Sequence, residues 1–471
     1  MSTDNKNLEL KKVLTPIHLW GLGVGIVISG SYFGWNFGLA ESGFVGMVIA
    51  TAIIGIMYTT LCLSLAELST IMPHAGGAYA FARRAMGPLG GYLTGVGVIL
   101  EFAVGTAVFT SGAGYYVNFL IPEINPIAAA AFLYVFFFII HILGVKEFAT
   151  IEMILVTVSV LFLIIFAFYG VPHISSEKLF SGELIPGGFS GVWAALPYAM
   201  WLYICMEMLP MLSEECKNPV KDMPRGIMSA IITLIVLAFL VVTVTVGLGG
   251  AEGASKESNP LSYALSVGVS KNLWVIDAIA IVGLFGLISS LAGSVLAYSR
   301  QVFSLSRAGY LPKFLSRLHN TRRTPYMAIV VPGALGFIFV LMFDPNKLIL
   351  ISTFGALVSY VMMNLSLIML RKKEPNLARP YKAPFYPVGP IICIIISVLA
   401  LFSAVFSDIT FFFISVAIFA LAVVYYFAWA RHNINSEAPE EQFVTESLSD
   451  SKGIASYEEV PESKKKEVAT S

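Results

Sequence analysis

The sequence is poor in charged residues. Only 12% of its 471 residues are Asp, Glu, Lys or Arg, whereas 57% are hydrophobic, and an ordinary soluble protein carries about 25% charged residues. The length would allow about three soluble domains of roughly 150 residues each, but so few polar side chains do not cover three water-facing surfaces. The composition therefore indicates a chain whose main solvent is lipid.

The sequence also lacks an excess of charge of one sign and is sparing in cysteine. Lys plus Arg and Asp plus Glu both number 29, so there is no basic surplus to bind nucleic acid. The four cysteines, Cys62, Cys205, Cys216 and Cys393, show no CxxC spacing, which argues against a disulfide framework or a zinc site. We expect no cofactor, no metal centre and no nucleic-acid partner.

Motifs of membrane-embedded enzymes are missing as well. The six histidines are scattered along the chain, and neither H-E-x-x-H nor G-x-S-x-G occurs. An enzyme would need paired metal ligands or a nucleophile with its base. The sequence therefore favours transport over catalysis, and a channel remains a third class, which would differ by the lack of substrate saturation.

Long apolar runs are what the sequence has in abundance. A helix needs about 20 residues to cross roughly 30 Å of hydrocarbon, and twelve runs approach or exceed that length. Their approximate limits are 16–41, 44–72, 88–120, 126–145, 150–170, 190–213, 226–249, 272–303, 326–343, 347–370, 386–407 and 410–430. We predict an all-α membrane protein with twelve transmembrane helices.

The basic residues test this count, because loops on the cytoplasmic side of a membrane are enriched in Lys and Arg. With both termini inside, 25 of the 29 basic residues fall on the cytoplasmic side, and only Lys178, Lys256, Lys271 and Lys347 fall outside. We therefore expect a multi-pass protein of the plasma (inner) membrane. A cytoplasmic N-terminal segment, 1–15, and a disordered cytoplasmic tail, 432–471, are expected to flank the spans.

The first span is interrupted by poor helix formers. Its middle reads Ile28-Ser29-Gly30-Ser31-Tyr32-Phe33-Gly34. Small residues there allow close helix packing, as in the G-x-x-x-G pairs Gly21/Gly25 and Gly30/Gly34. An unwound hinge beside a substrate cavity is the second interpretation, and the first span alone does not choose between them.

The sixth span favours the hinge. It contains Pro197 and Pro210, and between them lies Glu207, an acid in the middle of a membrane segment. Interrupted helices five spans apart are typical of an inverted-repeat transporter with its site near the midplane. The expected organisation is a first repeat, 16–170, a second repeat, 190–370, and two further helices within 386–430.

Four motifs carry a family resemblance. They are Glu214-Glu215-Cys216-Lys217-Asn218-Pro219 with Pro224-Arg225, Pro73-His74-Ala75-Gly76-Gly77-Ala78-Tyr79, Ser306-Arg307-Ala308-Gly309-Tyr310-Leu311-Pro312 with Thr324-Pro325, and Arg379-Pro380-Tyr381-Lys382-Ala383-Pro384. In this order they resemble the loops of the amino acid–polyamine–organocation (APC) superfamily. The resemblance covers roughly residues 15–430 and implies a LeuT-type fold of two inverted five-span repeats plus two helices.

The hinge departs from that of relatives that carry amino acids. Their "G-S/A-G-I-F" hinge, whose glycine N–H groups hold the substrate carboxylate, is replaced by Ser29-Gly30-Ser31-Tyr32-Phe33. Residues 29–39 look most like the hinge of the ethanolamine permeases within the superfamily. Ethanolamine has no carboxylate, which agrees with the bulkier Ser31.

The resemblance also implies a set of substrate contacts. Glu207 matches the glutamate of the superfamily's "G-F-E" hinge, although Cys205 replaces its glycine, and it would attract an ammonium group or carry a proton. Trp201 has the spacing of the tryptophan that covers the substrate in related arginine/agmatine exchangers. The remaining expected contacts are Ile28, Ser29, Gly30, Ser31, Tyr32, Tyr203, Ile204 and Cys205.

Acids elsewhere receive different interpretations. Glu101, in the middle of the third span, is expected either to complement the substrate cation or to partner a buried hydroxyl such as that of Thr106. Glu67 and Glu152 lie near span ends and are expected to be solvated or to cap helices.

Ion coupling stays open. In sodium-coupled relatives, hydroxyls of the eighth span hold the ion, which makes Ser289, Ser290 and Ser294 a candidate sodium site. In one proton-coupled branch a lysine of the fifth span replaces the sodium ion, and span five of this chain contains no such lysine, which excludes that mechanism. A proton on a carboxylate and uncoupled exchange remain as the other two possibilities.

The combined expectation is a secondary active transporter that takes up ethanolamine or a similar small amine by alternating access. The alternative is an amino acid permease or exchanger of the same fold.

Overall fold

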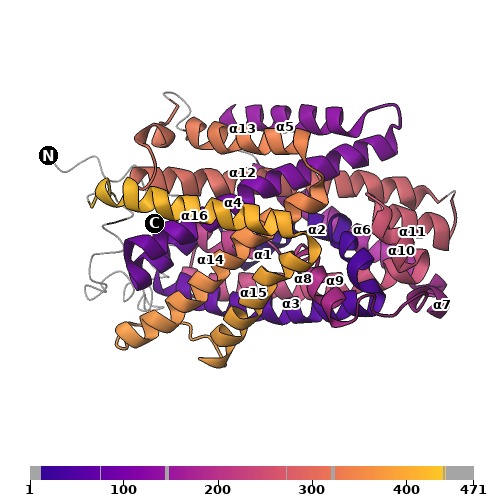
Figure 1. Cartoon of the computed structure of the whole chain (residues 1–471), viewed down its shortest axis with the longest axis horizontal. Coiled ribbons are helices and arrows are strands. Elements are labelled where there is room, and N and C mark those ends of the chain that lie inside the picture. Colours follow the sequence, from indigo (N-terminus) through magenta and orange to yellow (C-terminus); the bar gives the residue numbers. More distant parts are fainter. Residues whose placement is uncertain are drawn as a thin grey trace, which may run out of the picture.

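The computed structural model describes residues 12–74, 76–143, 148–271, 273–319, 324–436, 438 and 441. Within these ranges every element is helical, apart from a single β-bridge between Leu14 and Cys216. The long helices run roughly along one axis of an elongated bundle (Figure 1).

The helices are, in chain order, α1 (Pro16–Val27), α2 (Ser29–Tyr32), η2 (Trp35–Phe37), α3 (Gly38–Ile71), α4 (Gly77–Leu120), α5 (Pro126–Leu143), α6 (Phe148–Gly170), η3 (Val171–His173), α7 (Ser176–Leu179), α8 (Phe189–Met200), η4 (Met206–Glu215), α9 (Pro219–Gly249), α10 (Ala251–Lys256), α11 (Pro260–Gly268), α12 (Trp274–Arg307), η5 (Lys313–Ser316), α13 (Tyr326–Met342), α14 (Pro345–Lys373), α15 (Val388–Ser407), α16 (Ile409–Ala428) and η6 (Ala430–His432).

The helices confirm the predicted all-α membrane fold. Nine segments of the described chain are long and apolar enough to cross a membrane. The shorter helix α13 and the two interrupted segments, α1–α2 and α8–η4, complete the twelve predicted spans. Elements α7, α10 and α11 lie in loops at one end of the bundle (Figure 1).

Two glycines with positive φ divide the longest helices. Gly43 has φ 62° inside α3, and Gly87 has φ 79° inside α4, where Pro88 follows directly. A left-handed conformation is accessible to glycine at little cost, and proline suits the first position of a new helix. The first two spans therefore meet at Gly43, and the third span begins at Pro88 after a separate short helix, 77–86.

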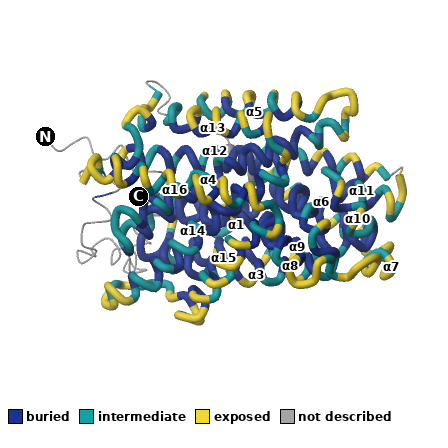
Figure 2. The backbone as a smooth tube through the Cα atoms, in the orientation of Figure 1, coloured by how far each residue is buried: buried dark blue, intermediate teal, exposed yellow. Residues whose placement is uncertain are grey.

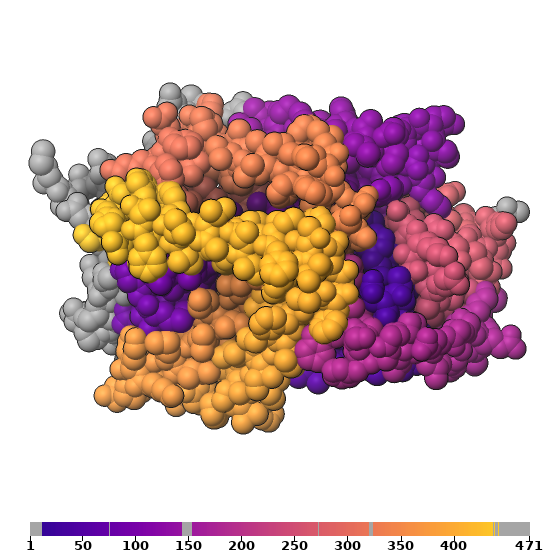
Figure 3. Space-filling model, viewed as in Figure 1, coloured from indigo at the N-terminus to yellow at the C-terminus, as the bar shows by residue number. Residues whose placement is uncertain are grey.

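Burial shows which helices carry the interior. The middle of the bundle, around α1, α4 and α14, is dark in Figure 2, whereas α5 and α13 are partly exposed along its upper edge. Helix α16 is also partly exposed. The exposed side chains of these three helices are apolar, for example Phe132, Leu335 and Leu421. Such an apolar outer surface is expected where a helix faces lipid. In Figure 3, α15 and α16 lie across the face in view.

Residues 12–15 and 430–436 lie at the same end of the bundle, which we call the basic end because Arg83, Arg300 and Arg371 form ion pairs there. The expectation of a disordered tail does not hold for the first stretch of 432–471. Residues 432–436, 438 and 441 are placed, and Ala438 and Glu441 are buried. The other tail residues, and residues 1–11, lie outside the described chain.

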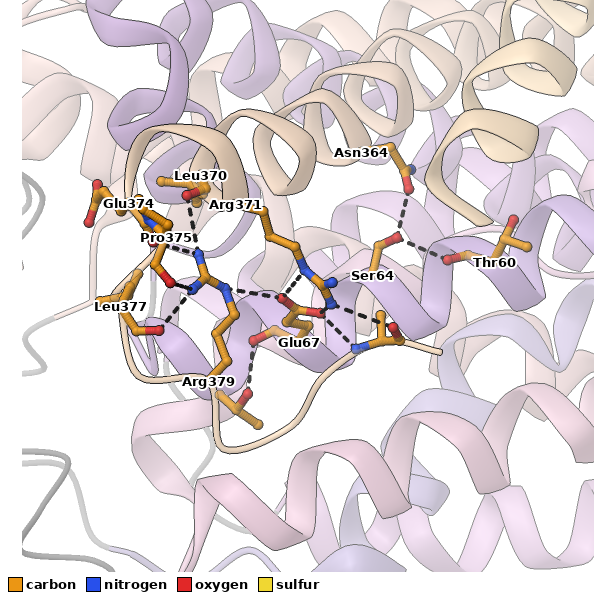
Figure 4. A network of polar contacts seen from close by, with 12 residues as sticks. Thr60, Ser64, Glu67, Asn364, Leu370, Arg371, Glu374, Pro375, Leu377 and Arg379 are labelled. Atoms are coloured by element: carbon orange, nitrogen blue, oxygen red, sulfur yellow. Dashed lines mark hydrogen bonds and ion pairs between the residues drawn. The ribbon is translucent and has the colours of Figure 1, made fainter. Parts of the chain in front are cut away.

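Glu67 is the centre of a buried ion network at the basic end (Figure 4). Its carboxylate accepts hydrogen bonds from Arg371 Nε at 2.8 Å and from the Ala383 N–H at 2.7 Å, and it pairs with Arg379 Nε at 3.5 Å. The side chain is fully buried. The interpretation of Glu67 as a solvated or capping residue is therefore wrong, because the arginines that bury it come from 304 or more residues later in the chain. Glu152 is among the residues whose side chains lie outside the description.

The Glu67 network generates a stability prediction. Glu67→Gln leaves two arginines without their anion, and breaking a buried ion pair costs about 3–5 kcal/mol. We expect a clear fall in the melting temperature of the detergent-solubilised protein. Glu252→Gln is the control, because its pair with Lys256 is exposed and should leave the melting temperature unchanged. Equal melting temperatures for the two variants would contradict the network's structural role.

Candidate functional site

The first interrupted span departs in detail from the prediction. Ile28 keeps helical dihedrals, and the Ser31 N–H donates to the Ile28 carbonyl at 3.0 Å. The chain leaves the helix only at Phe33, which is extended, and at Gly34, with φ 98°. The expected unwinding of Ile28–Gly34 is therefore confined to its end, because the small residues Ser29, Gly30 and Ser31 do not by themselves prevent helical hydrogen bonding.

Gly30 serves close packing rather than unwinding. A Cβ atom at Gly30 would lie 1.9 Å from the carbonyl oxygen of Trp201. The first span thus lies directly against the backbone of the sixth span, and only glycine permits this approach. Both interpretations of the glycine cluster hold in part: Gly30 packs, and Gly34 breaks the helix.

Tyr32 fastens the first span to its neighbouring helices through two hydrogen bonds. Its hydroxyl donates to the Ser159 carbonyl at 2.8 Å, and its own carbonyl accepts from the Tyr116 hydroxyl at 2.7 Å. The residue therefore ties the break to α4 and α6. Ile28 packs near Gly286 of α12, whereas the buried hydroxyl of Ser29 has no hydrogen-bond partner within the described chain.

The sixth span is interrupted as predicted. Helix α8 contains Pro197 and ends at Met200, and residues 201–205 follow as turns before η4 begins at Met206. Cys205 has φ 81°. Residues with a Cβ atom adopt this left-handed conformation at a cost of about 1–2 kcal/mol. The cysteine therefore stands at a position whose conformation suits the glycine of the superfamily pattern.

Glu101 and Glu207 come together in the middle of the bundle. The Tyr360 hydroxyl of α14 lies 3.2 Å from Glu101 Oε1 and 2.9 Å from Glu207 Oε2. The two carboxyl groups are also within hydrogen-bonding reach of each other, and all three side chains are fully buried. Two acids 106 residues apart in the chain thus form one site.

The spacing of α4 and α14 places Tyr360 between the acids. A Cβ atom on Gly355 would lie 2.7 Å from the Gly97 carbonyl oxygen, so the two helices are in backbone contact. Ser352 adds a hydrogen bond to the Glu101 carbonyl at 2.8 Å. Tyr360 follows Gly355 by little more than one turn, on the same stretch of α14.

The site has fewer hydrogen-bond donors than its carboxylate oxygens require, and no basic side chain of the described residues compensates its charge. Tyr360 and Tyr58, whose hydroxyls are 3.0 Å apart, carry one O–H hydrogen each, and ionised carboxylates only accept. One hydroxyl hydrogen cannot serve both acids and Tyr58 at once. Among the residues that the structure describes, neither Glu101 nor Glu207 forms an ion pair with a basic side chain, and one oxygen of each lacks a donor. Two buried charges without compensation are very costly, so a proton or a bound cation belongs here.

Trp201 packs against both the third span and the first interruption. Its ring packs against Phe109 at 5.3 Å, and a Cβ atom on Gly34 would contact its indole. The Phe109 ring lies over Gly105, one helical turn from Glu101. The buried indole N–H has no acceptor within the described ranges. Trp201 therefore joins the two interruptions about one turn away from the acids.

Tyr203, Ile204 and Cys205 are buried in the turns of the sixth span. The Tyr203 hydroxyl donates to the Thr51 carbonyl of α3 at 3.3 Å, and its ring packs against Tyr58. The Cys205 carbonyl accepts from the Met208 N–H at 3.2 Å. The Tyr203 side chain thus holds this segment to α3.

Part of the candidate ion site lies on the face of α12 that packs on α1. The Ser290 hydroxyl donates to the Gly25 carbonyl of α1 at 3.4 Å, and the buried Ser294 hydroxyl, one turn later, lacks a hydrogen-bond partner within the described chain. Gly293 packs against Ile26, so this face of α12 lies on α1. Ser289 is buried as well.

Two residues of the site were missed from sequence. Tyr360 and Tyr58 are aromatic residues in apolar runs, and nothing in their local pattern distinguishes them from packing residues. The available signal is chemical: a hydroxyl in a membrane span needs a partner, and the two buried acids are the partners it finds.

The family model described as "Amino acid permease" matches residues 18–438. An uncharacterised transporter of Rhizobium meliloti (strain 1021) is 28% identical over 84% of this chain and 87% of its own length. From Bacillus subtilis (strain 168), a branched-chain amino acid permease is 28% identical over 82% and 87%, and a methylthioribose transporter is 27% identical over 83% and 88%.

These relatives are transporters, and none of the three is described as carrying ethanolamine. The family match spans nearly all of the described helices. The chain therefore belongs to the amino acid permease family of the APC superfamily, and it is an integral, multi-pass membrane transporter rather than an enzyme.

Proposed function

We propose that this permease carries a small organic amine in its ammonium form, with ethanolamine as the first substrate to test. The observation that carries the proposal is the pair Glu101 and Glu207, bridged by Tyr360 and lacking a basic partner within the described chain. An ammonium group supplies both the positive charge and the hydrogen-bond donors that the two carboxyl groups need.

The first span supports a substrate without a carboxylate. In relatives that bind amino acids, free N–H groups of the hinge hold that carboxylate, as the resemblance implies. Here the Ser31 and Phe33 N–H groups already donate to the carbonyls of Ile28 and Ser29. The unpartnered Ser29 hydroxyl, and Ser31 beside it, suit the hydroxyl of an amino alcohol better than a second anion.

The remaining contacts follow from this placement. The ammonium group lies between the acids and the backbone carbonyls of 203–205, and Trp201 covers it through cation–π attraction. All of these side chains are buried, so entry and exit require the bundle to open on alternate sides. At the basic end, Arg300 of α12 pairs with Glu215 of η4 at 3.2 Å. Separation of these two helices breaks that pair.

A second candidate is a neutral amino acid, and the specific observation in its favour is the similarity to a branched-chain amino acid permease. Such a substrate would require the hinge N–H groups to be freed. Competition between ethanolamine and amino acids for uptake separates the two candidates.

Sidedness and coupling complete the proposal. The basic end faces the cytoplasm by the enrichment of Lys and Arg, in the plasma (inner) membrane. The coupling ion is either a proton on the carboxyl pair or sodium between Ser290, Ser294 and the backbone of α1. Uptake under an imposed proton or sodium gradient identifies it.

Uptake by proteoliposomes tests the proposed function. We expect saturable uptake of labelled ethanolamine, and Glu207→Gln should lower its efficiency about 100-fold, because loss of one partner of a buried charge pair costs about 2–5 kcal/mol. Glu252→Gln, an exposed acid, is the control for a lost carboxylate. Absence of saturable ethanolamine uptake under every gradient would refute the substrate, and full activity of Glu207→Gln would remove Glu207 from the site.

Substitution of the hinge serine tests selectivity. Ser31→Gly removes the hydroxyl and loosens the helix at Ser31 by roughly 0.5–1 kcal/mol, which frees N–H groups for a carboxylate. We expect alanine to compete better with ethanolamine in the variant than in the wild type. An unchanged competition profile would count against the role of the hinge in excluding carboxylates.

A further inference from the structure

The carboxylate of Glu441 is bound by an arginine and two tyrosines at the basic end. Arg83 Nε donates to Glu441 Oε2 at 2.8 Å, and the hydroxyls of Tyr79 and Tyr310 donate to Oε1 at 2.5 and 3.0 Å. Arg83 Nη2 adds a further bond to Oε2. The Glu441 side chain is only 1% exposed. A guanidinium fork and two hydroxyls around one buried carboxylate are a recognition site for an anion of this shape.

The site is assembled from two connections that lie far apart in the sequence. Tyr79 and Arg83 belong to the short helix 77–86, which follows the second span and ends at the Gly87 kink. Tyr310 belongs to the loop after α12. The carboxylate therefore bridges the connection between the second and third spans and the connection after the eighth span.

Residues 433–435 and Ala438, which precede Glu441, also pack against the bundle. Ala438, 2% exposed, and Ile434 pack into a separate apolar cluster with Tyr92, Tyr310 and Tyr426. The Asn435 N–H donates to the Ala308 carbonyl at 2.9 Å. A Cβ atom at Gly309, which has φ 88°, would lie 2.0 Å from the Asn433 carbonyl oxygen. The loop after α12 thus fits this segment closely.

The neighbouring ion pair, Arg84 with Glu374, differs because both of its residues belong to segments joined directly to membrane spans. Arg84, also on the short helix 77–86, pairs with Glu374 next to the end of α14 at 2.8 Å, and Lys373 donates to the Ala85 carbonyl. Those contacts hold the short helix to a membrane span. The partner of Arg83, in contrast, comes from beyond the last span, so it is able to leave without unfolding a membrane helix.

We propose that residues 432–436, together with Ala438 and Glu441, form a strap, whose Glu441 carboxylate is the ligand of the site formed by Arg83, Tyr79 and Tyr310. The strap holds the short helix 77–86 against the loop after α12 and restrains their relative movement. While the strap is bound, it slows the movement of helices at the basic end. Its effect on the rate of transport rests on the proposed function.

Two variants release the strap by different means. Glu441→Gln removes the charge, and Ala438→Arg unseats the apolar contact while leaving the carboxylate and its receptor unchanged. Glu374→Gln is the matched control, because it removes an arginine partner from the same short helix without touching the strap.

Hydrogen exchange of the full chain in lipid nanodiscs measures the strap without any substrate. We expect slow amide exchange in 432–436 of the wild type, and faster exchange in 432–436, 77–86 and 308–316 of both strap variants. Glu374→Gln should leave 432–436 protected. Wild-type exchange in 432–436 at the rate of an unstructured peptide would overturn the proposal, as would unchanged protection in both strap variants.

Ethanolamine uptake measures the consequence. Conformational couplings of ordinary size change an equilibrium constant about 5-fold or more. If the strap shifts the balance between seated and released basic ends by that factor, and release limits turnover, both strap variants should carry ethanolamine about 5-fold faster at saturation than the wild type. Faster exchange with an unchanged or slower rate would overturn the restraint on turnover. A wild type that carries no ethanolamine refutes the proposed substrate alone, because the exchange measurement still decides whether the strap exists.

Discussion

Two carboxyl groups buried in contact inside an apolar bundle are the constraint on which the rest of the site depends. Each of Glu101 and Glu207 would be costly to bury alone, and together they repel unless a proton or a cation joins them. The structure supplies one bridging hydroxyl, from Tyr360, and no basic partner among the described residues. The arrangement is completed by a proton or by the small cation that we propose as substrate.

The interruptions of the first and sixth spans serve this pair. The turns at 201–205 bring Glu207 to the start of η4 beside Glu101, and Gly30 lets the first span lie on the Trp201 carbonyl. Tyr32 then fixes the first span to α4 and α6. The same close packing that buries the acids also seals the site, so transport requires movement of whole helices. The ion pairs at the basic end, Arg300 with Glu215 and Arg83 with Glu441, lie where such movement would be controlled.

Much of the fold was predictable because its strongest constraints are local. An apolar run must be about 20 residues long to cross a bilayer, and Gly87-Pro88 marks the start of the third span as predicted. Pro197, Pro210 and Glu207 located the second interruption. The first break was misplaced within the span, because small residues tolerate a helix and Gly34, with its positive φ, is what ends it.

The rest depended on contacts between distant residues. Tyr360 reaches acids 259 and 153 residues away, and Glu67 meets arginines of the tenth span and the following loop. A tyrosine in an apolar run and an acid near a span end look ordinary until the helices are packed. Glu441 was hidden in the same way, since its polar surroundings in the sequence resemble those of a disordered tail.

A structure of the protein with ethanolamine bound is the most direct test of the central claim. The account predicts the ammonium nitrogen within about 4 Å of the carboxyl groups of both Glu101 and Glu207, with Trp201 over the ligand. Ethanolamine bound elsewhere, with the Glu101–Tyr360–Glu207 contacts unchanged, would contradict it.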